Sequence, residues 1–295
     1  MSEATIIDGR VLAAALRRRA AAAAARLKDE SGIVPGLATI LVGDDPASLS
    51  YVRSKTRAAG EIGIAGFERR LPADTTERAL IGEVTKLAAD ERVDAILVQL
   101  PLPPQIDAGR VIAAVDPTKD VDGFHPLNVG RLWSGLPGLV PCTPQACLRL
   151  IRTVKEDLAG AEAVVIGRSN IVGKPVAALL LAAGCTVTLI HSQSRDRAAI
   201  CRRADILVAA AGRARLVAPD WIKPGAVVID VGINWVAAPD GGNRIVGDVD
   251  YVPALAVAGA ITPVPGGVGP MTIACMVGNT LLAACRRRGL PEPLL

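Results

Sequence analysis

Hydrophobic and polar positions follow two patterns along this chain, one helical and one typical of buried strands. In the first half, apolar residues recur at helical spacing over residues 10–28, and continuous apolar runs occupy 36–43 and 94–100. Asp45 and Pro46 form a helix start signal between these runs, and that helix should end near residue 60. Other predicted strands cover 64–70, 163–167, 185–191, 205–211 and 226–232, and other predicted helices cover 75–90, 174–183, 196–203 and a final segment that runs to Arg288.

This strand–helix–strand order is typical of parallel sheets joined by right-handed crossovers. Three segments interrupt it, at 101–143, 232–244 and 260–272, and each is rich in Pro, Gly, Asn or Asp. We interpret all three as loops, with the Asp-Gly-Gly of the second as a turn signal. A loop as long as the first is usually functional or connects domains.

The composition is typical of a folded α/β protein. The chain has 295 residues, enough for two domains, and 51% of them are hydrophobic whereas only 2% are aromatic. A core of small aliphatic side chains suits helices packed on a parallel sheet. The net charge of +4 is modest and lacks the interleaved aromatic residues of a stacking surface, so we predict no nucleic-acid binding.

Six cysteines and two histidines show no zinc-binding spacing, so no metal site is predicted. Several cysteines lie in apolar runs, where a free thiol acts as a small hydrophobic group, and this favours a reducing compartment. Residues 10–28 are rich in Ala and Arg, as transit peptides are, but Asp8 can cap a helix with Val11 and Leu16 on its apolar face. We therefore predict the first helix of the mature fold there, and no membrane span.

The segment VVIGRSNIVGKP (164–175) stands between a predicted strand and a predicted helix, which is the position of a phosphate-binding turn. The G-x-G-x-x-G fingerprint is incomplete because Ser169 replaces the second Gly, and the Walker A pattern fails as well. Gly167 and Gly173 alone are also compatible with a tight turn that binds no ligand.

The end of the following strand distinguishes the two dinucleotides. NAD-binding domains carry an acidic residue there, but this chain reads HSQSR (191–195), whose hydroxyls and arginine would attract a 2′-phosphate. Arg168 adds a planar set of donors suited to phosphate oxygens. Asp196 opposes this interpretation, although it is equally placed to cap the next helix. We predict NADP rather than NAD, and no catalytic role for His191.

A second group of polar residues lies in the first half. Tyr51 and Lys55 are four residues apart on one helix face, a pairing that is also common on solvated helices. Gln99 ends an apolar strand where side chains can reach a crevice, though it could instead cap a turn. Two aspartates in KDVDGFHP (119–126) could be Asx-turn residues. The glycines of VPGGVGP (264–270) would let the backbone approach a flat ligand closely.

Six segments, in this order, resemble the bifunctional methylenetetrahydrofolate dehydrogenase/cyclohydrolase family: GDDPASLSYVRSK, QLPLP, PTKDVDGFHPLNVG, VPCTP, GRSNIVGKP and TPVPGGVGPMT. The matches run from about residue 6 to residue 281, nearly the whole chain. The resemblance implies NADP-dependent oxidation of 5,10-methylenetetrahydrofolate to its 5,10-methenyl form. It also implies hydrolysis of that form to 10-formyltetrahydrofolate.

The resemblance further implies roles for individual residues. Lys55 would be the catalytic lysine, Gln99 would hydrogen-bond and orient it, and Tyr51 would stack on the aminobenzoate ring of the folate. Asp122 would accept hydrogen bonds from the pterin. The other residues expected in the folate site are Leu100, Pro101, Gly266, Gly267 and Pro270, and those expected to bind NADP are Gly167, Arg168, Ser169, Gly173, Ser192 and Ile233.

The predicted fold is α/β, with two domains flanking a cleft. Residues 1–141 plus 271–295 would form a folate-binding catalytic domain, and residues 142–270 a Rossmann-type NADP-binding domain with a parallel sheet. The resemblance implies a cytoplasmic homodimer, joined through the nucleotide-binding domains, that acts on tetrahydrofolate derivatives. A neutral amine at Lys55 would assist proton transfer during hydrolysis, and no metal would be required.

Two alternatives stay open. A shikimate or amino-acid dehydrogenase would also place a lysine ahead of a dinucleotide domain, but neither accounts for Tyr51 together with the KDVDG loop. A catalytically silent folate- or nucleotide-binding protein would be expected to lack one of the residues assigned to catalysis. The family pattern is interrupted at Ala146, where Gly is expected, and mildly at Ser194 and Ile190.

Overall fold

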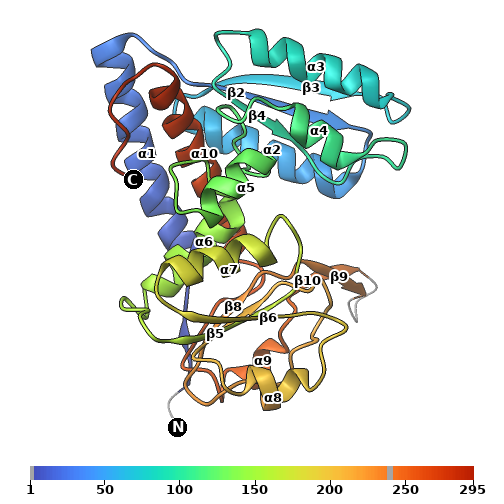
Figure 1. Ribbon diagram of the computed structural model, residues 1–295, viewed down its shortest axis with the longest axis vertical. Coiled ribbons are helices and arrows are strands. Elements are labelled where there is room, and N and C mark those ends of the chain that lie inside the picture. Colours follow the sequence, from blue (N-terminus) through green and yellow to red (C-terminus); the bar gives the residue numbers. More distant parts are fainter. Residues whose placement is uncertain (1–2, 238–241) are drawn as a thin grey trace. The chain divides into compact units, whose positions relative to one another are not determined.

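The computed structural model describes residues 3–237 and 242–295, and the chain divides into two compact units (Figure 1). We name each unit after its sheet. The three-strand unit comprises residues 14–142 and 273–295. The six-strand unit comprises residues 143–272 together with the described residues up to Ala13.

A parallel sheet in the order β3-β2-β4 is the centre of the three-strand unit. Its middle strand is buried along its whole length, as expected for a continuous apolar run. Leu80, Val84 and Val111 from two helices pack on the same face of the sheet as Ile40 and Ile96. The elements are most of α1 (Gly9–Ser31), β2 (Gly36–Val42), α2 (Pro46–Glu61), β3 (Ala65–Leu71), α3 (Glu77–Ala89), β4 (Ala95–Val98), α4 (Ala108–Ala114), α5 (Pro126–Trp133) and most of α10 (Val268–Arg287).

The six-strand unit contains a wholly parallel sheet in the order β1-β11-β8-β7-β5-β6. Figure 1 shows α7 on one face of this sheet and α8 and α9 on the other. Because the chain moves outward from β5 in opposite directions, the topological switch point lies between β5 and β7. The elements are β1 (Thr5–Ile6), α6 (Cys142–Arg152), β5 (Glu162–Ile166), α7 (Gly173–Ala182), β6 (Thr186–Ile190), α8 (Arg197–Cys201), β7 (Ile206–Ala209), β8 (Val227–Asp230), β9 (Asn234–Ala237), β10 (Asn243–Val246), α9 (Tyr251–Ala254) and β11 (Ala260–Ile261).

The predicted α/β class is confirmed, and each strand predicted from an apolar run is present. The N-terminal residues belong to a different unit from the one that the sequence predicts. The residues up to Ala13 join the six-strand unit, because β1 pairs with β11 in its sheet. Asp8 accepts a hydrogen bond from the backbone N–H of Arg10 at 2.8 Å, as its predicted capping role requires. Val11, however, is 64% exposed, so its predicted place on the apolar face of the first helix is wrong.

The interpretation of residues 101–143 as a single loop is wrong. Asp107 starts α4 by accepting from the backbone N–H of Arg110 at 3.1 Å, and His125 starts α5 by accepting from that of Leu127 through Nδ1. These helices have seven and eight residues, too short to carry a clear apolar period between the prolines and glycines.

The predicted loop at 232–244 is also wrong in part, because β9 and β10 form an antiparallel pair there. The Asp240 and Gly241 of its predicted Asp-Gly-Gly turn lie outside the described residues. The predicted loop at 260–272 contains β11 and the first residues of α10. By length and composition α10 could cross a membrane, with a mean hydropathy of 1.5, but 72% of that stretch is buried inside the protein. Its apolar character is therefore explained by its place in the core.

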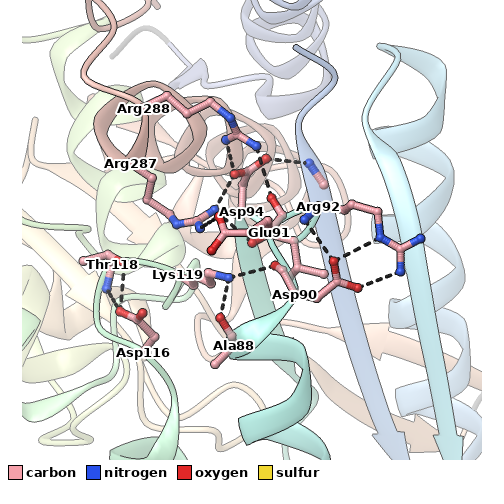
Figure 2. A network of polar contacts seen from close by, with 12 residues as sticks. Ala88, Asp90, Glu91, Arg92, Asp94, Asp116, Thr118, Lys119, Arg287 and Arg288 are labelled. Carbon is pink, nitrogen blue, oxygen red and sulfur yellow. Dashed lines mark hydrogen bonds and ion pairs between the residues drawn. The ribbon is translucent and has the colours of Figure 1, made fainter.

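A buried ion-pair cluster joins the end of α10 to the sheet of the three-strand unit (Figure 2). Asp94, which directly precedes β4, is fully buried. It accepts hydrogen bonds from Arg287 Nη1 at 2.6 Å and from Arg288 Nη1, and from the backbone N–H of Gly36 at 3.0 Å. The C-terminal helix is thereby fixed to the start of two neighbouring strands.

Lys119 extends this cluster toward the loop after α4 (Figure 2). Its side chain is almost fully buried and donates to the carbonyl oxygens of Ala88 at 2.6 Å and Asp90 at 3.0 Å. Burial, helped by the charge of Arg287, lowers the pKa of the Lys119 amine. The backbone of Lys119 accepts a hydrogen bond from the N–H of Ile96, so the loop runs beside β4.

Candidate active site

Lys55 lies on the buried face of α2. Asp45 caps this helix by accepting from the backbone N–H of Ser48 at 2.8 Å. From that cap the buried positions recur at helical spacing, and Lys55 falls between Val52 and Ala59 among them. Lys55 is only 7% exposed, so the Tyr51–Lys55 pair is not an ordinary pair on a solvated helix.

Gln99 meets the Lys55 amine at the carboxyl end of β4. Its backbone N–H donates to Ile40 at 2.9 Å, which continues the pairing of the sheet. The side-chain Nε2 donates to the carbonyl oxygen of Leu100 at 2.6 Å, so Oε1 is turned toward Lys55 and accepts from Nζ at 3.2 Å. Leu100 is half-buried and Pro101 is exposed, and both follow directly at this edge of the sheet.

Tyr51 and Asp122 complete the group around this amine. The Lys55 Nζ atom lies 6.0 Å from the centroid of the Tyr51 ring. Burial raises the pKa of Tyr51, so the ring stays neutral at physiological pH. Asp122 is half-buried; burial raises the pKa of its carboxyl group, and the charge of Lys55 lowers it. The sequence-predicted residues Tyr51, Lys55, Gln99 and Asp122 are thus brought together in one unit.

Asp120, the other aspartate of the KDVDGFHP loop, has a structural role. Asp120 is buried and accepts from the backbone N–H of His125 at 2.8 Å and from Asn128 Nδ2 at 2.9 Å, so it shapes the loop. Burial raises the pKa of Asp120, and these hydrogen bonds lower it. Asn279 of α10 holds the next residue by donating to the carbonyl oxygen of Val121 at 2.9 Å. Sequence reasoning missed Asn279, because an Asn inside an apolar helix gives no signal of its partner.

The turn between β5 and α7 is too tight for side chains at two positions. Gly167 has a φ of +119°, and a Cβ atom there would lie 2.1 Å from the carbonyl oxygen of Ala210. A Cβ atom on Gly173 would lie 1.9 Å from the carbonyl oxygen of Gly167. The Ser169 hydroxyl accepts from the backbone N–H groups of Val172 and Gly173 at 3.1 and 3.2 Å. The turn follows β5 at the switch point of the sheet, and Arg168 and Ser169 in it are exposed.

Arg168 extends from this turn to the end of β6. Its Nη2 donates to Gln193 Oε1 at 3.2 Å, and both side chains are exposed, as is Ser192 beside them. Asp196 has a left-handed φ of 47° and its side chain makes no capping hydrogen bond, so the capping role considered for it is wrong. An exposed guanidinium group beside hydroxyl and amide groups fits the 2′-phosphate of a dinucleotide.

The remaining predicted residues also lie in the six-strand unit. Gly266 and Gly267 are buried before α10, and Pro270 is half-buried in its first turn. A Cβ atom on Gly9 would lie 1.7 Å from the carbonyl oxygen of Gly267, so two backbone segments are in close contact here. Ile233 is 44% exposed after β8. Within the described part of the chain, no group of three or more His, Cys, Asp or Glu could hold a metal ion, and the six cysteines are buried and form no disulfide.

Comparison with known families agrees with this geometry. The NAD(P)-binding domain of tetrahydrofolate dehydrogenase/cyclohydrolase matches residues 141–288. The catalytic domain of the same family matches residues 7–122, which include Tyr51, Lys55, Gln99 and Asp122. The chain belongs to this family. As a tetrahydrofolate dehydrogenase/cyclohydrolase it is an enzyme, which removes the alternatives of a shikimate dehydrogenase and of a silent binding protein.

Relatives from several organisms match this family member over its whole length. Bifunctional protein FolD 2 of Paracoccus denitrificans is 60% identical over 98% of this chain and 95% of its own length. The FolD dehydrogenase/cyclohydrolase of Campylobacter jejuni is 44% identical, with a TM-score of 0.92 over 96% of this chain and 99% of its own. The Trypanosoma brucei enzyme, solved with NADP cofactor and an inhibitor, is 43% identical, with a TM-score of 0.94 over 98% of this chain and 99% of its own.

Proposed function

We propose that this chain oxidises 5,10-methylenetetrahydrofolate with NADP and then hydrolyses the 5,10-methenyl product to 10-formyltetrahydrofolate. The observation that carries the proposal is the buried Lys55 amine, which is held by Gln99 beside Tyr51 and Asp122 in the domain matched as catalytic. Family membership and relatives about 60% identical support the same two activities.

The residues of the three-strand unit suit both the substrate and the reaction. Tyr51 offers a neutral aromatic face on which the aminobenzoate ring can stack. The Asp122 carboxylate accepts hydrogen bonds from the N–H groups of the pterin. When bound, the dinucleotide accepts the hydride that leaves the methylene bridge. Lys55 and Gln99 are the residues that we assign to the one-carbon bridge, which would then carry positive charge.

Hydrolysis is the step that needs Lys55 most directly. Water adds to the methenyl carbon, the bond from that carbon to N5 breaks, and one proton is released overall. The Lys55 amine would take a proton from the attacking water and return one to the leaving ring nitrogen. Gln99 aims the amine, because its Nε2 is already engaged by Leu100 and only Oε1 faces Lys55.

An assay with purified protein tests the proposal. Methylenetetrahydrofolate with NADP should give the methenyl product, whose absorbance then decays as it is hydrolysed. NAD in place of NADP should react more slowly, and shikimate should give no reduced dinucleotide. A protein that turns over neither folate substrate would refute the proposed function.

The Arg168→Ala variant tests the choice of dinucleotide. We expect it to weaken NADP binding about 10–100-fold, because a hydrogen bond to a charged group contributes about 1.5–3 kcal/mol and 1.4 kcal/mol is tenfold. NAD binding should change far less, since NAD has no 2′-phosphate. Arg203→Ala, at an exposed arginine remote from the turn, is the matched control. Equal losses for both dinucleotides, measured by titration, would overturn the assignment.

The proposal extends to a homodimer joined through the six-strand units and to a cytoplasmic enzyme that binds neither nucleic acid nor membranes. The family resemblance supports the dimer, and six buried cysteines that form no disulfide suit a reducing compartment. Sedimentation velocity of the purified protein should give twice the mass of the chain, and a single species at 30.4 kDa would contradict the dimer.

A further inference from the structure

Two buried carboxylates lie near the carboxyl end of the six-strand sheet, and the mechanism above uses neither. Asp230 is the last residue of β8 and is 1% exposed, and Asp248 follows β10 and is 0% exposed. Among the residues that the structure describes, neither has a salt bridge to Lys, Arg or His. Burying two carboxylates without a cation is costly, so their hydrogen bonds must compensate for the lost water.

Asp248 binds the backbone of the turn that follows β7. Its carboxylate accepts from the backbone N–H groups of Ala211 at 2.6 Å, Gly212 at 2.9 Å and Arg213 at 2.8 Å. It also accepts from Asn234 Nδ2 at 2.9 Å. One carboxylate therefore ties the turn after β7 to the segment after β8.

Asp230 ties that same segment to the end of the β9–β10 hairpin. It accepts from the backbone N–H groups of Gly232, Asp248 and Val249, each at 2.9 Å. Burial, helped by the charge of Asp248, raises the pKa of Asp230 to about 7 although these hydrogen bonds lower it. Asp230 thus fixes the backbone of Asp248 itself.

The backbone packs so closely against both carboxyl groups that two neighbouring positions, Gly232 and Gly247, have no room for a side chain. A Cβ atom on Gly247 would lie 1.8 Å from Asp230 Oδ2, and one on Gly232 would lie 2.3 Å from Asp248 Oδ1. Ile233, which lies between Gly232 and Asn234, is 44% exposed. Gly232 is held by Asp230, and Asn234 is held by Asp248.

We propose that Asp230 and Asp248 are positioning residues for hydride transfer, which fix Ile233 and the 211–213 turn around the nicotinamide end of the NADP site. The carboxyl ends of β7 and β8 form the edge of a parallel sheet where dinucleotides bind. A rigid wall at that edge fixes the orientation of the nicotinamide, to which hydride transfer is sensitive. This inference rests on the proposed function, since it assumes that NADP is the hydride acceptor.

The two activities of one protein supply the test. Asp248→Asn loses an acceptor and turns an N–H₂ group toward backbone donors, so the segments should shift. We expect the kcat of the dehydrogenase to fall about 10–100-fold with a smaller change in the KM for NADP. Hydrolysis of added methenyltetrahydrofolate, which needs no dinucleotide, should stay within twofold of wild type. The matched control is Asp250→Asn, whose side chain makes no capping bond at α9.

A second, milder variant keeps the inference testable if Asp248→Asn does not fold. Asn234→Ala removes one of the four hydrogen bonds to Asp248, and it should lower the dehydrogenase kcat in the same direction but by less. The inference is overturned if either folded variant keeps the wild-type dehydrogenase kcat, or loses both activities equally. A wild-type protein without NADP-dependent activity would instead refute the proposed function, so the two failures are distinguishable.

Discussion

Replacing Lys55 with methionine is expected to slow hydrolysis of 5,10-methenyltetrahydrofolate by about 10²–10⁴-fold, the range that a positioned acid–base group contributes. Lys55 is 7% exposed and lies on the apolar stripe of α2, so an unbranched apolar side chain can occupy its place. The fold and folate binding should therefore persist while proton transfer is lost. The decay of methenyl absorbance measures the rate, and calorimetric titration with a folate analogue measures binding.

Lys86→Met is the matched control for that experiment. Lys86 lies on α3 of the same unit, its side chain is 78% exposed, and it pairs with Glu83 at 3.5 Å. This variant should hydrolyse the methenyl substrate at the wild-type rate. A folded Lys55→Met protein that also does so would show that the role assigned to Lys55 is wrong.

Replacing Asp94 with alanine is expected to have the largest effect on stability. The change leaves Arg287 and Arg288 without their buried partner and the backbone N–H of Gly36 without an acceptor. Breaking a buried ion pair costs about 3–5 kcal/mol, and we expect about 3 kcal/mol because both arginines keep some contact with water.

Urea denaturation of the protein measures this loss. Glu292→Ala, which removes an exposed partner of Arg286 at the same end of α10, should lower the unfolding midpoint much less. Because β4 starts directly after Asp94 and ends directly before Gln99, the Asp94→Ala variant should also lose activity as it loses stability. An Asp94→Ala protein that unfolds at the wild-type urea concentration would contradict the place given to this cluster.

Long apolar runs and cap residues allowed much of the fold to be predicted from the sequence. The runs at 36–43 and 163–167 became β2 and β5, and Thr76 caps α3 by accepting from Ala79. Short elements without a continuous apolar run escaped prediction, because four to eight mixed residues do not establish a period. The β9–β10 hairpin, α4 and α5 all lie in segments whose Pro, Gly and Asn content indicated loops.

Polar residues next to the ends of predicted strands made part of the candidate site predictable. Gln99 was singled out because it ends an apolar run, and the structure places it 3.2 Å from the Lys55 amine. Asp230 and Asp248 were missed although both also stand near strand ends. A single sequence does not distinguish a carboxylate that accepts from buried backbone N–H groups from one that is solvated, since its partners belong to the folded backbone.

A crystal structure of the protein with a folate analogue and the dinucleotide tests the central claim most directly. The account predicts the Lys55 Nζ atom on the side of the one-carbon bridge, within roughly 3–3.5 Å of the reacting atoms and still bonded to Gln99. An amine that turns into solvent, away from a bound pteridine, would contradict it.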